Sequence, residues 1–380
     1  MKRAMTVLAC LALCGAFFTA PVYAEETLSN HELSMRIEQL EKKLGKEGGI
    51  LPDKWSERIA LSGLIEVEAG YTSTDYSDGT SDDESDIAVS AVELGIDADI
   101  VKHVFGHVLF KYEDDEDVFV DEATITISGE DVVPAYLTAG KMYVPFGNFE
   151  THMISDPLTL EIAETRESAI QVGVETGGFY GSAFIFNGDV DEAGEDDDHI
   201  NNFGANAGYT MESETFTIDA GISYINNLID ADGWEELLET DEDGNGVPDA
   251  ELKDYVGGMG VYAIVGFGPF TFIGEYITAL DEIEWLQEDG EIVRQDEICA
   301  WNLEVGYAFA IAEKEAAVAV ALQGTDEAAG LLPESRYMGS FGISIFESTT
   351  LAFEYAHDEF EDVADEDEAD TFTAQLAIEF

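Results

Sequence analysis

The amino-acid sequence predicts an all-β protein: a transmembrane antiparallel β-barrel of about sixteen strands. The clearest observation is the carboxy-terminal segment from Glu368 to Phe380, which alternates between apolar and polar residues and ends on an aromatic residue. Phe372, Ile378 and Phe380 fall on one side of the pattern, and Gln375 falls on the other. A period of two with one apolar face indicates a half-buried strand. An apolar face toward lipid and a polar face toward water are typical of a strand in an outer-membrane barrel.

The same alternation recurs along the chain from Glu57 onward. In the first segment, from Ile59 to Ala69, the apolar residues face lipid and Glu66 and Glu68 point inward. Segments of about ten residues, joined alternately by short turns and longer loops, fit strands that cross a bilayer. The other segments centre near Leu94, Val108, Ile125, Leu137, Val172, Phe184, Ala205, Ile218, Tyr262, Phe272, Leu303, Val318, Ile343, Phe353 and the closing strand. We expect short turns at 177–178, 212–213 and 268–269, and longer acidic loops at 72–86, 188–199, 229–254 and 358–370.

A soluble acidic protein is the main alternative to a barrel. The apolar residues show no sustained helical periodicity, however, and occur as short alternating runs. The longest uncharged stretch after the amino terminus, 256–274, contains six glycines and is interrupted by a Gly-Pro pair, so two strands explain it better than one transmembrane helix. Lipid cannot satisfy the outer amides of a sheet, so such a sheet closes on itself. At this strand number side chains do not fill the interior, and an aqueous channel remains.

The amino terminus has the features of a secretory signal peptide over residues 1–24. Lys2 and Arg3 precede an apolar run, and small residues before Glu25 offer a cleavage position. Lipidation of Cys14 is the alternative, but the preceding Leu13 is bulky for a lipoprotein signal. Cys299 would then be the only cysteine of the mature chain, so disulfides would not hold the fold.

Residues 25–56 form a separate segment before the predicted barrel of 57–380. Leu33, Ile37, Leu40 and Leu44 recur at spacings of four, three and four, which indicates a short helical coiled-coil seam. One reading is a periplasmic coiled coil that helps three barrels associate into a homotrimer. The other reading is a single amphipathic helix that docks elsewhere.

The net charge of the chain limits the kinds of partner that it can bind. The formal net charge is −66, with 82 acidic and 16 basic side chains. Nucleic acid is excluded, because binding phosphates requires Lys and Arg. The imbalance fits a saline habitat, a cation-attracting pore, or both. Inward-facing acids would line such a pore, and the alternation predicts Glu66, Glu68, Glu93, Asp97 and Asp99 in that role.

The segment from Ala139 to Val174 is unusually non-repetitive and predicts a loop that narrows the lumen. A strand ends near Pro145, because proline removes a ladder donor. The alternative is that Asp156, Pro157 and Arg166 only pin the loop to the wall through a salt bridge and a turn. A ring of mixed charge in a narrow lumen orients solutes, and the candidate residues for solute contact are Lys141, Glu150, Asp156, Glu161, Glu164 and Arg166.

The run GKMYVPFGNFETHMISDPLTLEIAETRESA, Gly140 to Ala169, resembles the LbtU family of siderophore porins. The amino-terminal segments and Phe380 agree with this resemblance, which extends over the whole mature chain. It implies an outer-membrane channel of a Gram-negative bacterium that takes up ferric siderophores passively, without an energised plug-type receptor. Many ferric siderophores are anionic, whereas the predicted lumen is acidic. A general cation-preferring porin for small hydrophilic solutes is therefore the alternative, and a non-conducting barrel with ion-binding surface loops is a third.

Two patterns in the sequence bear on metal binding. Residues 241–249 carry oxygen ligands at the spacing of a calcium loop, and position 12 is Leu252 in place of glutamate. The candidate ligands are Asp241, Asp243, Asn245, Val247 and Asp249, for a calcium ion that is structural or bridges to lipopolysaccharide. His103 and His107 are about 13 Å apart on a strand, too far for one ion. No nucleophile–base pair, phosphate loop or dinucleotide motif occurs, so neither an enzyme nor a cofactor is predicted.

Overall fold

The computed structural model describes residues 58–113, 117–129, 132–194, 199–213, 215–234, 250–287, 290–328, 331–361 and 366–380. The predicted signal peptide, the predicted coiled coil and the predicted calcium loop at 241–249 lie outside these residues. In the described part, no helix has the length and apolar character needed to cross a membrane.

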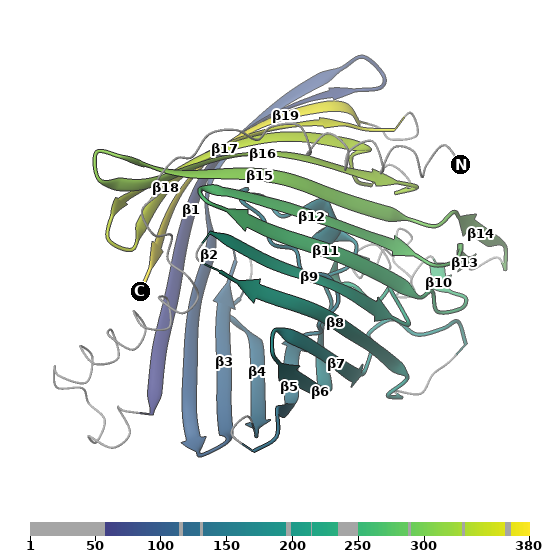
Figure 1. Cartoon of the computed structure of the whole chain (residues 1–380). Helices are drawn as coiled ribbons and strands as arrows, with labels where there is room; N and C mark the ends of the chain where they lie inside the picture. Colours follow the sequence, from purple (N-terminus) through teal and green to yellow (C-terminus); the bar gives the residue numbers. More distant parts are fainter. Residues whose placement is uncertain are drawn as a thin grey trace. The chain divides into compact units, whose positions relative to one another are not determined.

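The described residues form strands almost throughout (Figure 1). The strands are β1 (Ile59–Tyr76), β2 (Ser81–Val101), β3 (Val104–Tyr112), β4 (Phe119–Ser128), β5 (Ala135–Tyr143), β6 (Arg166–Thr176), β7 (Phe179–Phe186), β8 (Asn202–Glu212), β9 (Phe216–Ile225), β10 (Ala250–Leu252), β11 (Gly258–Phe267), β12 (Phe270–Ala279), β13 (Ile283–Gln287), β14 (Ile292–Gln295), β15 (Cys299–Ile311), β16 (Lys314–Asp326), β17 (Ser335–Phe346), β18 (Thr349–Glu359) and β19 (Glu366–Glu379). One short helix, α3 (Leu158–Glu161), lies between β5 and β6.

Sixteen of these strands form one closed antiparallel barrel, so the prediction of a sixteen-stranded barrel is confirmed. The first and last strands close it: Tyr71 pairs with Phe372, and Leu64 pairs with Glu379. The carboxy-terminal residue completes the seam, because Phe380 and Gly63 exchange backbone hydrogen bonds of 2.8 and 3.0 Å. Closure gives every wall strand two neighbours and removes the unpaired edges that lipid cannot satisfy.

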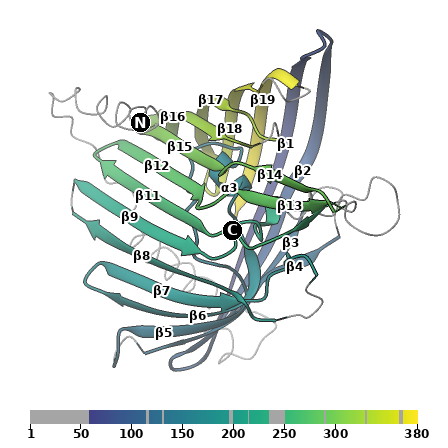
Figure 2. The same cartoon turned by 90° about the vertical axis from the view of Figure 1, so that its right-hand side faces the viewer.

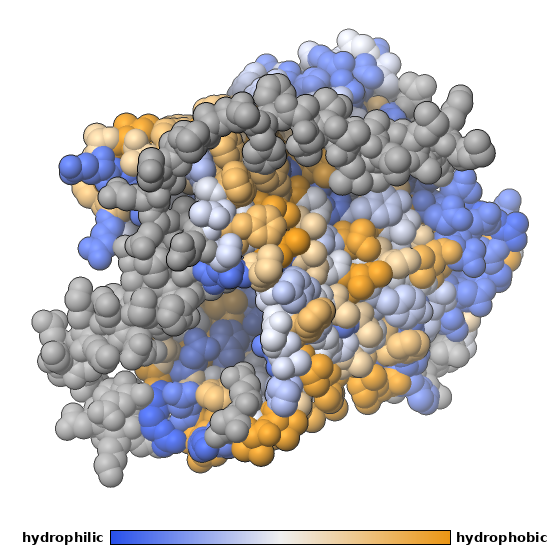
Figure 3. Space-filling view, viewed as in Figure 1, coloured by the Kyte–Doolittle hydropathy of each residue, from blue (hydrophilic) through white to orange (hydrophobic). Residues whose placement is uncertain are grey.

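The outer face of the barrel is apolar. Exposed residues such as Ile65, Ile170, Val320 and Leu376 alternate with inward residues along their strands. Aromatic side chains gather near the strand ends, as in the pair Phe270 and Tyr307, whose ring centroids are 4.9 Å apart. In the space-filling view, hydrophobic residues spread over the outside of the strands, and hydrophilic residues gather at the end near β10, β13 and β14 (Figure 3). An apolar outer face with aromatic residues toward the strand ends is typical of outer-membrane barrels.

Short turns lie at one end of the barrel and long loops at the other. Two-residue turns such as 177–178, 268–269 and 312–313 occupy the first end, which is periplasmic in outer-membrane barrels. The expected acidic loops at 72–86 and 358–370 are wrong in extent. β1 pairs with β2 as far as Asp75 and Ser81, and β18 and β19 run to Glu359 and from Glu366. Ladder hydrogen bonds extend these strands through segments in which most of the described acidic side chains are exposed, although Asp358 is buried.

The loops of the extracellular end fold together over one side of the lumen. β10, β13 and β14 form a small separate sheet. A buried cluster joins this sheet to the β5–β6 connection and includes Phe146, Leu158, Ile229 and Ile283. Figure 2 shows α3 within the ring of strands. Contacts of α3 with β12, β15 and β16 place it against that part of the inner wall.

Candidate channel constriction

The connection from β5 to β6, residues 144–165, folds into the lumen; we call it the constriction loop. Its entry is set by Gly147, whose φ of 74° is in the left-handed region that favours glycine. The Gly147 N–H donates to Ser223 Oγ of β9 at 3.1 Å. Before this turn, Val144 and Phe146 are buried in the apolar cluster. The start of the loop is therefore anchored to β9 as soon as the chain leaves β5.

Three carboxylates of the wall then hold the loop by its backbone. Glu275 of β12 accepts the N–H groups of Asn148 and Phe149 at 2.7 and 3.1 Å. Glu304 of β15 accepts the N–H of His152 at 2.8 Å and the hydroxyl of Thr151 at 2.6 Å. The third acid is Glu354. The exposed fraction is 5 % for Glu275, 2 % for Glu304 and 2 % for Glu354. Buried carboxylates are stable when hydrogen-bond donors of this kind surround them.

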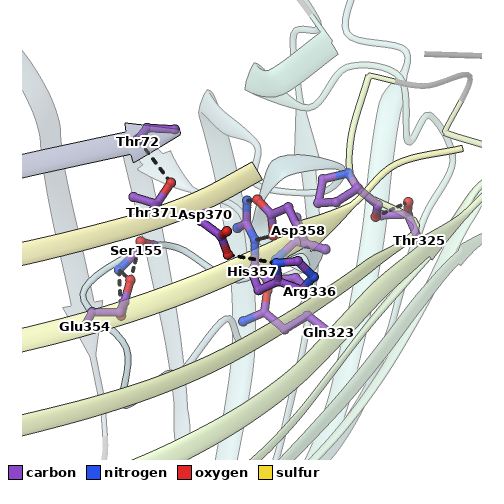
Figure 4. Close-up of polar contacts among 12 residues, drawn as sticks. Thr72, Ser155, Gln323, Thr325, Arg336, Glu354, His357, Asp358, Asp370 and Thr371 are labelled. Atoms are coloured by element: carbon purple, nitrogen blue, oxygen red, sulfur yellow. Dashed lines mark hydrogen bonds and ion pairs between the residues drawn. The ribbon is translucent and has the colours of Figure 1, made fainter. Parts of the chain in front are cut away.

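Glu354 of β18 holds the far end of the loop. It accepts the N–H of Ile154 at 2.5 Å and the hydroxyl of Ser155 at 2.5 Å (Figure 4). The chain then turns back, and the Leu158 N–H donates to Gln323 Oε1 of β16 at 3.0 Å. The loop thus crosses the inner wall from β9 to β18 and returns. Each hydrogen bond to a charged group contributes roughly 1.5–3 kcal/mol, so the loop is a fixed part of the wall.

The predicted acids of the loop lie where the loop faces the lumen. Glu150, Asp156 and Glu161 are exposed, and Glu164 is half-buried. Burial, with the nearby carboxylates of Asp232 and Asp156, raises the pKa of Glu164 to about 7. Although the Asp156 side chain is open to the lumen, the surrounding protein reduces its hydration and raises its pKa, while Lys111 acts in the opposite direction.

The two predicted basic residues are placed differently from the sequence expectation. The expected Asp156–Arg166 salt bridge is wrong: Arg166 Nη1 binds Asp121 at 2.5 Å, and among the described residues Asp156 has no ion pair. Asp121 reaches Arg166 because it lies at an irregularity of β4, where the register shifts. Lys141 pairs with Ser168 and Ala123, which puts it on the face that carries the exposed Ile170. By register Lys141 therefore lies on the outer face, although its charge still acts on Asp232, whose carboxylate acts in turn on Glu164.

The predicted lumen acids share one face of β1 and β2. Glu66 and Glu68 lie opposite Ala377 and Gln375 of β19, and Gln375 Nε2 donates to Glu68 at 2.9 Å. Glu93 pairs with Leu64 and Asp97 with Ala60, and Asp99 follows two residues later on the same face. The opposite face carries exposed apolar residues such as Leu61 and Leu94. Glu66 and Glu68 lie toward the constriction loop, because Glu66 lines a cavity with His152 and the charge of Glu68 acts on Asp156. Asp97 and Asp99 lie next to the short turn between β2 and β3.

A family model for Gram-negative porins matches residues 9–377, almost the full chain. The chain belongs to the Gram-negative porin family. It is similar to a UPF0422 protein of Coxiella burnetii, with 28 % identity over 84 % of this chain and 68 % of that protein. A UPF0422 protein of Legionella pneumophila is 26 % identical over 79 % of this chain, which spans only 59 % of that relative's length.

Solved outer-membrane porins share the fold at low sequence identity. The outer membrane channel DcaP of Acinetobacter baumannii matches with a TM-score of 0.56 and 12 % identity, over 84 % of this chain and 97 % of that one. OmpF of Salmonella typhi, solved with daunomycin, matches with a TM-score of 0.56 and 12 % identity, over 85 % and 97 %. The protein is therefore a porin of the outer membrane, a channel for small solutes rather than an enzyme.

Two bases of this porin that sequence reasoning passed over lie beside the loop acids. Lys111 of β3 pairs in register with Glu93 and forms an ion pair with Glu113 at 2.8 Å. Its charge acts on Asp156 and Glu164. Arg336 of β17 binds Asp358 through two hydrogen bonds of 2.7 and 3.0 Å (Figure 4). Both residues fall on the inward side of an alternating strand pattern, and basic residues are rare in this chain. Together these two features could have identified them from the sequence.

Metal binding in the described residues has no candidate cluster: no group of three or more His, Cys, Asp or Glu side chains is arranged to hold an ion there. The predicted calcium ligands at 241–249 lie outside that part of the chain.

Proposed function

We propose that this porin is a passive, cation-preferring channel for small hydrophilic solutes. The charge of the constriction supports this proposal most directly. Asp156, Glu161 and Glu164 lie on a fixed loop, and around them the acidic side chains outnumber Lys111. Carboxylates that line a narrow passage lower the energy of a cation there and raise that of an anion.

Charge at the constriction has more effect than charge at the rim. At physiological ionic strength exposed charges are screened beyond about 8 Å, so acidic loops at the barrel ends act only locally. Within the lumen every solute passes close to the loop acids. Asp156→Asn and Glu161→Gln are therefore expected to reduce cation preference more than Asp78→Asn at the β1–β2 turn.

Ferric siderophores are the second candidate solute class. The segment from Gly140 to Ala169, which resembles siderophore porins, contains the whole constriction loop. This coincidence supports a role of the segment in solute choice. The acidic lumen would admit neutral or cationic complexes and repel anionic ones.

Planar-bilayer recordings with a panel of ferric siderophores separate the two candidates. Saturable block by one neutral or cationic class, with little effect of the iron-free chelator, supports siderophore uptake. Asp156→Asn should weaken that block, and Asp78→Asn should leave it unchanged. A cation-selective current that the whole panel leaves unchanged supports a general porin. An anion-selective wild-type current refutes the proposal.

Two further properties remain proposals. We propose a homotrimer, supported by the coiled-coil spacing of Leu33, Ile37, Leu40 and Leu44. The solved OmpT of Vibrio cholerae includes a trimer form. We also propose that 241–249 binds calcium, either as a structural ion or as a bridge to lipopolysaccharide. Calorimetric titration of the purified porin with calcium, with Asp243→Asn as the control, tests that site.

A further inference from the structure

A cavity of about 290 Å³ lies between the constriction loop and the inner wall. His152, Met153 and Ile154 of the loop form one side, and Glu66 and Gln375 form part of the other. The remaining lining comes from β16, β17 and β18, mostly from small residues such as Ala319 and Gly342. The volume is close to the lower end of the range for small-molecule sites.

The side of the cavity made by the loop is rigidly held. The amide of His152 donates to Glu304, and its carbonyl oxygen accepts the hydroxyl of Ser340 at 3.0 Å. The amide of Ile154 donates to Glu354. A cavity whose walls are fixed before a solute arrives loses little conformational freedom on binding.

One part of the lining is largely apolar, apart from His152 and Ser340, and the other part is anionic. Met153 packs in a buried cluster with Ala319, Ala321, Met338 and Ala356. Across the cavity stands the Glu66 carboxylate, with Glu68, Glu93 and Glu379 acting on it and Lys111 as the single opposing base. A solute that satisfies both sides carries a compact apolar part and one positive charge.

We propose that this cavity is a binding subsite for a small organic cation of the alkylammonium class. The proposal rests on the proposed cation preference of the channel and adds a site at which one class of cation binds transiently. The ammonium group would lie toward Glu66, and the alkyl part would lie against Met153 and the small residues of the wall. The neutral alcohol and the carboxylate of the same chain length would lack the charge that Glu66 recognises.

The test is block of potassium current in planar bilayers by n-butylammonium, with n-butanol and butyrate as matched solutes. Two variants address the site: Glu66→Gln removes its charge, and Gly342→Leu fills it. A side chain at Gly342 meets no atom within 4 Å of its first carbon, so the added leucine enters open space. Gly70, equally open but outside the cavity, gives the matched control Gly70→Leu. Asp97→Asn removes a carboxylate of the same wall that neither lines the cavity nor acts on Glu66.

We expect discrete blocking events by n-butylammonium, absent with butanol and butyrate. The half-blocking concentration should rise about tenfold or more in Glu66→Gln and Gly342→Leu, and less than about twofold in both controls. Equal effects of Glu66→Gln and Asp97→Asn would overturn the subsite in favour of general lumen charge. Equal block by Mg²⁺ would overturn the organic-cation assignment.

The subsite and the proposed function can fail separately. Absence of block in a wild-type channel whose reversal potential has the sign of potassium would refute the subsite alone. A reversal potential with the sign of chloride would refute the cation preference itself. If Gly342→Leu does not assemble, Glu66→Gln carries the test, because it adds no volume.

Discussion

Glu304 of β15 accepts the backbone N–H of His152 at 2.8 Å, although the two residues are 152 positions apart in the chain. Glu275 and Glu354 make equivalent contacts with the same loop. An acid that points into the lumen would ordinarily add to the field felt by solutes. Here three buried acids face backbone donors instead, so they fix the loop while other acids define the charge of the passage.

Removing one of these acids should loosen the constriction loop. Glu304→Ala leaves the His152 amide and the Thr151 hydroxyl without their acceptor, which costs about 1.5–3 kcal/mol for each bond to the charged group. We expect a noisier and larger single-channel current and easier unfolding in urea. Glu315→Ala, at the exposed short-turn end of β16, is the control. Identical conductance and stability of both variants would show that Glu304 does not hold the loop.

The turn at the start of the loop should require glycine. Gly147→Ala places a side chain in the left-handed region, at a cost of roughly 1–2 kcal/mol, and against the ring of Phe149. We expect a lower urea midpoint and altered conductance. Gly70→Ala, where the added carbon meets open space, should change neither. Wild-type behaviour of Gly147→Ala would mean that the loop enters the lumen by another conformation.

Lys111 should oppose the cation preference of the channel. Its charge acts on the loop acids Asp156 and Glu164. Lys111→Gln should move the reversal potential in a KCl gradient further toward potassium, because it removes the base facing those acids. Lys314→Gln, at the β15–β16 turn, should have little effect. A shift toward chloride in Lys111→Gln would contradict the assignment of this wall.

The channel should become less cation-selective as pH falls through about 7. The pKa of Glu164 is raised to about 7, so this carboxyl is charged at pH 8 and becomes neutral by pH 6. Reversal potentials measured across this window should follow that titration. Glu164→Gln should flatten the profile, whereas Glu150→Gln, which also removes a loop acid, should preserve it. An unchanged profile in Glu164→Gln would assign the pH response to another group.

The coiled-coil prediction can be tested on the assembled protein. Leu33→Asp with Leu40→Asp places charges in the predicted seam and should convert trimers to smaller species on native gels. Glu38→Asp, outside the seam, is the control. A trimer that survives both seam substitutions would defeat the coiled-coil explanation of assembly.

The strands could be predicted because their signal is local. Alternation in a segment such as Ile59 to Ala69 depends only on which side faces lipid, and the sixteen expected segments correspond to the sixteen barrel strands. The extent of the β1–β2 hairpin was not visible, because the acids Asp82, Asp83 and Glu84 look like a loop until their pairing with β1 is known.

The constriction was predictable only in part. The non-repetitive run marked the loop, but its anchors depend on pairs distant in sequence, such as Thr151 with Glu304. Arg166 was expected to meet Asp156, yet an irregularity in β4 brings Asp121 to it. The outward register of Lys141 follows from strand pairing, which local spacing does not specify.

The proposed cation preference is tested most directly by the reversal potential of the purified wild-type channel in a planar bilayer, under a KCl gradient of about tenfold at pH 8. An acidic constriction with Lys111 as its outnumbered base predicts a potential with the sign of potassium. This potential should shrink in Asp156→Asn and Glu161→Gln. A potential near zero, or with the sign of chloride, would show that the loop carboxylates do not set the ion selectivity of the passage.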